Sequence, residues 1–292
     1  MSVSAAQVKE LRERTGAGMM DCRKALEATA GNMDAAIEKL RMEGQAKAVK
    51  KAGRTAADGT IAVAAGADAI AIVEVNCETD FVAKGDDFQA FAAAAARAAL
   101  DTGARSIDQL SAAKIGGKAV EDVRKEMVAK IGENITVRRV ERVAKAGGAI
   151  GHYVHAGSRI GVVVALDAGD AELARDLAMH VAASRPQFLK PADVPADVRD
   201  AERKVIEAQS ADSGKPPEIV KKMIEGRLNK YLGEISLTGQ PFVKDPDQTV
   251  EKVLAARKGA VARFVRFEVG EGIEKQETDF AAEVAKMSQQ KH

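Results

Sequence analysis

An internal repeat narrows the choice of fold for this chain more than any other feature of its sequence. Each copy has two apolar segments with the composition of buried strands, two segments with helical spacing of apolar residues, and a third strand-like segment. The first copy begins near Asp58 and the second ends near Val269. The sequence therefore predicts an α+β fold whose core consists of two β-β-α-α-β subdomains.

The two copies can be matched segment by segment. In the first copy the strands are expected at 59–64, 69–75 and 134–140, and the helices near 86–95 and at 120–128. In the second copy the strands are expected at 149–154, 160–166 and 261–269, and the helices at 173–181 and 250–254. The elements follow the same order in both copies, as a duplicated unit would require.

The second copy carries an insertion of about 36 residues between its second and third strands. Residues 195–231 supply this length as two charged helical segments joined by a loop that contains Gly and Pro. Two helices joined by a short loop form an antiparallel hairpin. Each helix is too polar to belong to the main core, so the hairpin is predicted to project from it.

The first 45 residues predict three short helices. Ser4 and Gln7 form a capping box before the first helix, and Gly44 is expected to end the third. The apolar faces of the helices are marked by Val8 and Leu11, by Cys22 and Leu26, and by Met33, Ile37 and Leu40. So small a bundle suits docking to a partner better than catalysis. Met19 and Met20, at the glycine-rich turn, either form an adaptable contact surface or fill the small core.

Residues 46–57 are basic and contain no acidic residue. The basic side chains are Lys47, Lys50, Lys51 and Arg54. The simplest interpretation is a solvated linker, and an RNA-binding patch is the alternative.

A glycine hinge and a short helix are expected after residue 269, with Thr278 or Asp279 as the cap.

These boundaries predict five parts. They are a helical bundle at 1–45, a linker at 46–57, two core subdomains at 58–145 and 146–269, and a terminal helical module at 270–292. The hairpin at 195–231 belongs to the second subdomain.

Phe81 stands in a polar connection between a predicted strand and a predicted helix. Asp86, with Gln89 three residues later, predicts the cap of that helix. A large ring with acidic and hydroxyl neighbours on a surface connection suggests an anchor for another molecule. Alternatively, the ring packs under the following helix, since most Phe side chains are buried.

The charge balance gives no general attraction to nucleic acid or anionic lipid, because 44 basic and 43 acidic residues leave a net charge of +1. No apolar run approaches the ~20 residues of a membrane span, and the first residues lack the pattern of a secretion signal. We therefore expect a cytoplasmic protein that binds no membrane.

Cys22 and Cys77 are far apart and lack Cys-x-x-Cys spacing, so neither a disulfide nor a zinc site is expected.

The sequence contains no catalytic or cofactor motif that we identify. It lacks a Walker loop, a dinucleotide-binding fingerprint, and the Gly-x-Ser-x-Gly and His-Glu-x-x-His patterns. His152 and His155 are three apart on an expected strand and so point to opposite faces, which separates them as metal ligands. His180 lies on the apolar side of its helix, as a hydrogen-bonded structural histidine would. A binding or regulatory protein without cofactor or metal is therefore favoured over an enzyme.

Four segments carry a resemblance to a known family. They are LRERTGAGMMDCRKAL at 11–26, VNCETDFVAK at 75–84, MHVAAS at 179–184 and SLTGQPF at 236–242. Over residues 8–287 the chain resembles the bacterial elongation factor Ts family. The resemblance implies a ubiquitin-associated-like domain for the N-terminal bundle and two core subdomains for the repeat. It also implies a coiled-coil insertion for the hairpin and a C-terminal module for the last helix.

The resemblance implies guanine nucleotide exchange on elongation factor Tu. A factor of this family binds the GDP form of the GTPase, displaces its magnesium ion and GDP, and holds the empty state until GTP binds. The segment that displaces magnesium corresponds to Thr79, Asp80, Phe81 and Val82. The residues that contact the partner correspond to Arg12, Met19, Met20 and His155, and the loop 236–242 lies near further contacts. Such exchange needs no catalytic side chain, and the resemblance allows a homodimer or a 2:2 complex with the partner.

Two other classes of function compete with this one. A small-molecule-binding enzyme with its site between the two repeated subdomains requires polar groups that converge in a cleft, and the Ala-rich repeat offers none that we identify. An RNA-binding accessory factor would use the basic stretch 47–54, but no aromatic residue stands beside it for base stacking. We therefore expect a protein partner and no direct contact with nucleic acid.

Overall fold

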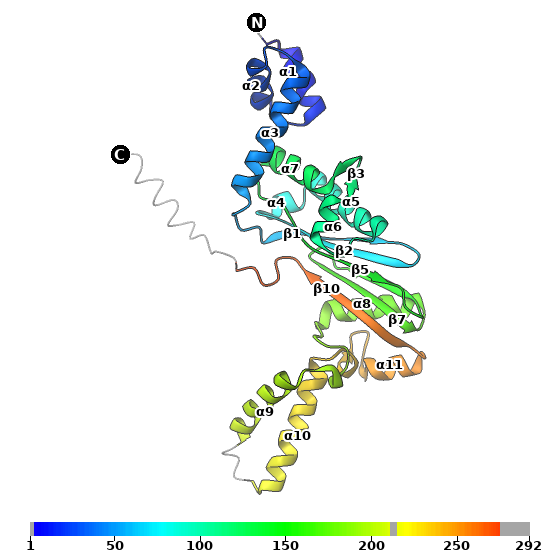
Figure 1. Ribbon diagram of the computed structural model, residues 1–292. Helices are drawn as coiled ribbons and strands as arrows, with labels where there is room; N and C mark the ends of the chain where they lie inside the picture. The colour runs from blue at the N-terminus through cyan, green and yellow to red at the C-terminus, as the bar shows by residue number, and fades with distance from the viewer. Residues whose placement is uncertain (1–2, 211–214, 275–292) are drawn as a thin grey trace, which may run out of the picture.

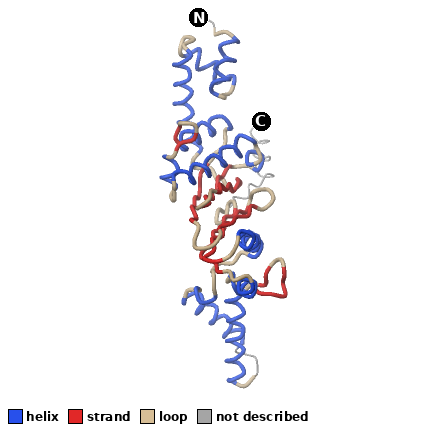
Figure 2. Tube along the Cα trace, turned by 90° about the vertical axis from the view of Figure 1, so that its right-hand side faces the viewer, coloured by secondary structure: helices blue, strands red, loops and turns tan. Residues whose placement is uncertain are grey.

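The computed structural model describes residues 3–210 and 215–274 of the chain. It has a mixed fold of helices and small antiparallel sheets, in agreement with the α+β prediction. The molecule is elongated, with the first helices at one end, the sheets in the middle and a pair of long helices at the other end (Figure 1). Figure 2 shows the same order from the side.

Three helices at the N-terminus pack around a small apolar core. They are α1 (Ala5–Thr15), α2 (Met19–Ala28) and α3 (Met33–Lys51). The predicted capping box is present, because the Ser4 hydroxyl accepts from the Gln7 N–H at 3.2 Å and Gln7 Oε1 accepts from the Ser4 N–H at 3.0 Å. The predicted apolar faces meet in a core of Val8, Leu11, Cys22, Ala25, Leu26 and Ala36.

The prediction that the third helix ends at Gly44 is wrong, since α3 continues to Lys51. A close contact with α7 (Val120–Ile131) explains the glycine: a Cβ added at Gly44 would lie 3.1 Å from the Cβ of Ala129. Beyond this contact Ala48 is buried in the main core. Residues 46–51 are therefore the last part of α3, which reaches the main core through Ala48 and leaves Val49 and Lys50 exposed.

The first sheet has the strand order β1-β2-β5, with antiparallel neighbours. Its strands are β1 (Asp58–Ala65), β2 (Ala69–Cys77) and β5 (Thr136–Ala144), so all three predicted strands are present. The central strand β2 is buried along its whole length. The helices α5 (Asp86–Thr102), α6 (Ile107–Ala112) and α7 share its core, with Phe88, Phe91, Leu110 and Val128 among the buried side chains.

Several short elements lie outside the predicted pattern. They are α6, the two-residue strands β3 (Lys114–Ile115) and β4 (Lys118–Ala119), the 3-10 helices η1 (Pro191–Asp193) and η2 (Leu237–Gly239), and the strands β8 (Pro241–Phe242) and β9 (Asp245–Thr249). Segments this short do not show a clear period of apolar residues.

The second sheet repeats the plan of the first, with the order β10-β7-β6. Its strands are β6 (Ile150–Val154), β7 (Ile160–Ala168) and β10 (Ala260–Glu268), and the predicted helices are α8 (Ala171–Ser184) and α11 (Val250–Ala256). In both sheets the second strand of the repeat is central and pairs with the first and the third.

The two sheets pack against each other through a shared apolar layer. Its buried side chains are Ile61, Ile70, Ile72, Val143, Val163, Ala165, Phe267 and Val269. Gly161 allows the close approach, because a Cβ added there would lie 2.5 Å from Cγ2 of Ile61. A backbone hydrogen bond of 2.7 Å from the Ile61 N–H to the Ser158 carbonyl joins the two copies directly.

The predicted insertion is an antiparallel helical hairpin that projects from the second sheet (Figure 1). Its helices are α9 (Ala196–Ser210) and α10 (Pro217–Glu234). They have a core of their own, formed by Val194, Ile206, Leu228 and Leu232. The hairpin therefore contributes little to the main core, as its polar composition predicts.

After β10 the chain turns at Gly270 and Gly272, both with a φ of 75°. The predicted terminal helix, with its cap at Thr278 or Asp279, lies outside the described residues.

In the part of the chain that the structure describes, none of the helices has the length and apolar character to span a membrane.

Candidate functional site

The connection between β2 and α5, residues 78–84, is here called the Phe81 turn. It contains a single-turn helix, α4 (Asp80–Ala83), with Thr79 as its N-cap. Phe81 is 82% exposed, so the interpretation that its ring packs under the next helix is wrong. The predicted cap at Asp86 is also wrong, since Gly85 is the N-cap of α5 and the Gln89 side chain donates to the Ala83 carbonyl instead.

The short helix α4 explains why the ring is exposed. Ala83 is buried in the main core and Val82 packs against it, so these two residues fix the inner face of the helix. Asp80 and Phe81 lie on its outer side. Lys84 lies 2.6 Å from Asp80 Oδ2, and its hydrogen bond lowers the pKa of that exposed carboxyl. The turn therefore presents an exposed aromatic ring on the helix that carries this charged pair.

The thiol of Cys77 also fixes the start of the turn. Burial raises the pKa of Cys77 to about 12, so the thiol keeps its proton, and it donates to the Thr79 carbonyl at 3.1 Å. Both Cys22 and Cys77 are buried and free in the structure.

Met19 and Met20 are 56% and 62% exposed at the start of α2, so the interpretation that they fill the core of the bundle is wrong. Arg12 is exposed on α1. Figure 1 places α1 and α2 at the end of the molecule, with the length of α3 between them and α4. The bundle and the Phe81 turn are therefore two separate surfaces.

His155 follows β6 and is exposed. Its Nδ1 lies 3.2 Å from the hydroxyl of Tyr153. Both side chains line a cavity of about 440 Å³ on the second subdomain, together with Ile160, Met179, Ala182, Ala183, Arg185, Val243 and Lys244. This is a third surface.

Among the described residues no group of three or more His, Cys, Asp or Glu side chains is placed to hold a metal ion.

His180 is a structural histidine, as predicted. It is fully buried, its Nε2 lies 2.9 Å from Gln240 Oε1, and its Nδ1 accepts from the Val243 N–H at 3.1 Å. Burial lowers the pKa of His180, so the ring is neutral and donates from Nε2. Gln240 in turn donates to the Glu234 carbonyl at 2.7 Å. The segment 236–242 is thereby anchored to α8 and to the end of the hairpin.

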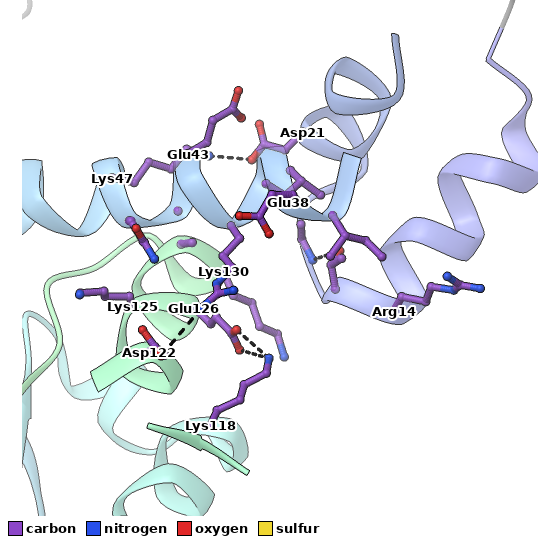
Figure 3. Close-up of a pocket in the computed structure, with 18 residues that line it drawn as sticks. Arg14, Asp21, Glu38, Glu43, Lys47, Lys118, Asp122, Lys125, Glu126 and Lys130 are labelled. Atoms are coloured by element: carbon purple, nitrogen blue, oxygen red, sulfur yellow. Dashed lines mark hydrogen bonds and ion pairs between the residues drawn. The ribbon is translucent and has the colours of Figure 1, made fainter. Parts of the chain in front are cut away.

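A cavity of about 370 Å³ lies between the N-terminal bundle and α7 (Figure 3). Both basic and acidic side chains line it. The ion pairs are Lys47 with Asp21 at 2.9 Å, Lys118 with Glu126 at 2.6 Å and Arg41 with Asp122 at 4.0 Å. Lys51 donates to the Gly132 carbonyl, and Arg54 pairs with Glu78 at 3.4 Å. Ion pairs with acidic residues therefore involve Lys47 and Arg54 of the basic stretch 47–54.

The space between the two sheets, where the alternative hypothesis placed a small-molecule site, is filled by the shared apolar layer around Ile61 and Gly161. The described residues there do not provide the convergent polar groups that such a site requires.

Sequence reasoning missed one residue of the Phe81 turn's surroundings. Glu133 lies beyond α7 and its carboxylate contacts the turn across 54 positions of sequence. A glutamate that follows a glycine at a helix end does not by itself indicate contact with a distant turn. Only the pairing of β2 with β5 brings Glu133 to the Phe81 turn.

Comparisons with known proteins extend over nearly the whole chain. A family model described as "Elongation factor TS" matches residues 78–271. Elongation factor Ts of Methylococcus capsulatus is 58% identical over 287 residues, which cover 97% of this chain and 98% of that protein. Elongation factor Ts of Hydrogenovibrio crunogenus is 59% identical over 288 residues, which cover 98% of this chain and 97% of that protein. The chain is 55% identical to elongation factor Ts of Thioalkalivibrio sulfidiphilus over 287 residues.

Proposed function

The chain belongs to the elongation factor Ts family, and from that premise we propose how its geometry serves guanine nucleotide exchange on elongation factor Tu. Its function is that of an exchange factor in translation elongation. On our proposal the Phe81 turn enters the nucleotide site of the partner and displaces magnesium and GDP. The factor then holds the nucleotide-free state until GTP binds. The alternative of a small-molecule enzyme has no support.

The observation that carries the proposal is the exposure of Phe81, a large apolar ring that is 82% accessible on a short helix fixed at both ends. Aromatic side chains of this kind dominate interfaces when a partner buries them. The residues proposed to displace the magnesium ion are Thr79, Asp80, Phe81 and Val82. Their inner side chains hold the turn and their outer side chains meet the partner.

A wedge of this size is sufficient for exchange. Magnesium bridges phosphate oxygens and requires near-octahedral geometry, so a small shift of the loops that hold it weakens nucleotide binding. The factor loosens the nucleotide only as much as it prefers the nucleotide-free partner, and nucleotide expels the factor to the same degree. The proposal therefore needs no catalytic side chain from this chain.

We propose two further contact surfaces. The first is the end of the N-terminal bundle, where Arg12, Met19 and Met20 are exposed. The second is the cavity beside His155 on the second subdomain. Three separated contacts on an elongated molecule would hold the partner while the Phe81 turn acts on its nucleotide site.

The finer identity of the parts also belongs to this proposal. The N-terminal bundle is assigned as a ubiquitin-associated-like domain, the two sheets as duplicated subdomains, the hairpin as a coiled-coil insertion and residues 270–292 as a C-terminal module. The proposed setting is the cytoplasm, with no direct contact to nucleic acid. A homodimer or a 2:2 complex with elongation factor Tu is compatible with it.

Release of labelled GDP from elongation factor Tu, measured by stopped flow with and without this protein, tests the proposal. The protein should accelerate release, and the acceleration should fall as magnesium is raised, because the ion and the turn compete for the same state of the partner. Acceleration that does not change across the magnesium series would contradict ion displacement.

A further inference from the structure

Glu133 holds the Phe81 turn with both oxygens of its carboxylate. Oε2 accepts from the N–H groups of Glu78 and Thr79, each at 3.1 Å, and Oε1 accepts from the Thr79 hydroxyl at 2.7 Å. Hydrogen bonds to a carboxylate are stronger than those between neutral groups. Three of them converge on two consecutive residues that directly precede α4.

The Thr79 hydroxyl passes this restraint on to the helix that carries Phe81. It donates to Glu133 and accepts from the Val82 N–H at 3.4 Å, so one oxygen joins the carboxylate to the first turn of α4. The Thr79 carbonyl accepts from Cys77. Every polar group of Thr79 is thus bonded, and the direction in which α4 leaves β2 is fixed.

Glu133 is itself held in place from two sides. The preceding residue, Gly132, ends α7 with a φ of 88° and accepts from Lys51 of α3. The following residue, Asn134, donates its N–H to Glu78 Oε1 at 2.6 Å and its amide to the Arg54 carbonyl at 2.7 Å. Glu78 and the 133–134 segment therefore exchange hydrogen bonds in both directions, which makes the carboxylate a rigid support.

We propose that Glu133 is a positioning residue for nucleotide exchange: it orients the Phe81 turn so that the aromatic ring is presented to the partner already fixed in place. This inference rests on the proposed role of Phe81. A ring on a loose turn would lose conformational freedom on docking, whereas a ring on a fixed turn would not. Glu133 touches neither the partner nor the nucleotide on this account and acts through Thr79 and α4.

The test begins with Glu133→Gln, which keeps the shape of the side chain and removes its charge and one acceptor oxygen. GDP release from elongation factor Tu at saturating factor should fall about tenfold, as expected when charge-assisted hydrogen bonds are lost. Glu141→Gln is the matched control, because Glu141 lies on β5 and pairs with Arg263 at 2.7 Å, and it should leave exchange unchanged.

A double-mutant cycle separates positioning from general structural support. In a Phe81→Ala background, Glu133→Gln should lower exchange less than about twofold, because the group it positions is gone. Thr79→Val should follow the same pattern, and Thr79→Ser, which keeps the hydroxyl, should restore exchange. If Glu133→Gln lowered the exchange rate by the same factor with and without Phe81, the proposal would be overturned. If Glu133→Gln does not fold, as judged by a thermal melt, the comparison of Thr79→Val with Thr79→Ser tests the proposal instead.

A second measurement needs no partner and so distinguishes this proposal from the proposed function. The chain has no Trp, so Phe81→Trp introduces a single fluorescent reporter at the turn. Its anisotropy should show restricted local motion, and adding Glu133→Gln should increase that motion while the melting temperature of the core stays the same. Unchanged local motion contradicts positioning by Glu133. Full exchange activity of Phe81→Ala would instead contradict the role of Phe81, whatever the anisotropy shows.

Discussion

The carboxylate of Glu74 accepts a hydrogen bond of 2.8 Å from the backbone N–H of Gly270, although the two residues are 196 positions apart. Glu74 is fully buried in β2 and also accepts from Arg138 at 3.1 Å and from Arg139. The guanidinium of Arg139 lies 4.4 Å from the ring centre of Phe267. One buried carboxylate thus ties the first sheet to the end of β10 and to the turn that follows.

Glu74→Ala is expected to lower the free energy of unfolding by about 3 kcal/mol, because it removes the buried carboxylate shared by Arg138, Arg139 and the N–H of Gly270. Urea denaturation should measure this loss. Glu141→Ala is the control, since its ion pair with Arg263 is partly exposed to solvent and should be worth less than about 1 kcal/mol. Similar losses in the two variants would show that burial of Glu74 does not matter.

Phe81→Ala should slow GDP release from elongation factor Tu by about thirtyfold, which corresponds to about 2 kcal/mol for one interfacial aromatic ring. Its thermal stability should change by less than about 0.5 kcal/mol, because the ring is 82% exposed. Asp80→Ala should have a weaker effect, through loss of its contact with Lys84. Stopped-flow exchange beside thermal melts checks both. A Phe81→Ala protein with full activity would eliminate the wedge mechanism.

Two truncations test how α3 joins the bundle to the core. Removing residues 1–44 should weaken capture of the partner and leave the core folded, because Ala48 and Lys51 stay in place. Removing residues 1–54 should destabilise the core as well, since Asn134 then loses its acceptor at Arg54. Circular dichroism melts and a pull-down with elongation factor Tu compare the two. A core that unfolds in the shorter truncation would contradict this account.

Stability should depend on pH through His180. Burial lowers its folded pKa below the ordinary value of 6.5, so the unfolded chain binds the extra proton first as pH falls. The free energy of unfolding should therefore be constant above about pH 7 and decline below about 6.5, with a slope of up to about 1.4 kcal/mol per pH unit from one histidine.

Urea midpoints between pH 5 and pH 8 measure this slope in the wild type and in His180→Gln. The variant should be less stable at pH 8 and less sensitive to acid. His155→Gln is the control for the replacement of an exposed histidine. An unaltered slope in His180→Gln would show that another group controls the acid sensitivity.

The sequence predicts the main elements well because each buries one continuous face. The six strands of the two sheets, the hairpin and the capping box at Ser4 follow from local spacing alone. The end of α3 does not follow from local spacing. Gly44 allows close contact with Ala129 and does not end the helix. Nothing in the spacing of residues 33–51 distinguishes these two uses of glycine.

The site is less predictable than the fold. The residues of the Phe81 turn are found from their polarity and their resemblance to a family. Most Phe side chains are buried, however, and that general preference wrongly predicts a buried Phe81. Exposure of Phe81 depends on α4, whose inner residue Ala83 packs in the core. The support from Glu133 depends on the register of β2 against β5, which local sequence does not contain.

The hairpin α9–α10 stands between β7 and β10, so the third strand of the second sheet must find its neighbour across a longer stretch of chain than in the first sheet. Loop closure becomes less favourable only with the logarithm of loop length, and here the added entropy amounts to about 0.4 kcal/mol. The hairpin's own core lowers this further by bringing its ends together. A projecting module can therefore be gained, lengthened or lost at this position almost without effect on the folding equilibrium of the sheet beside it.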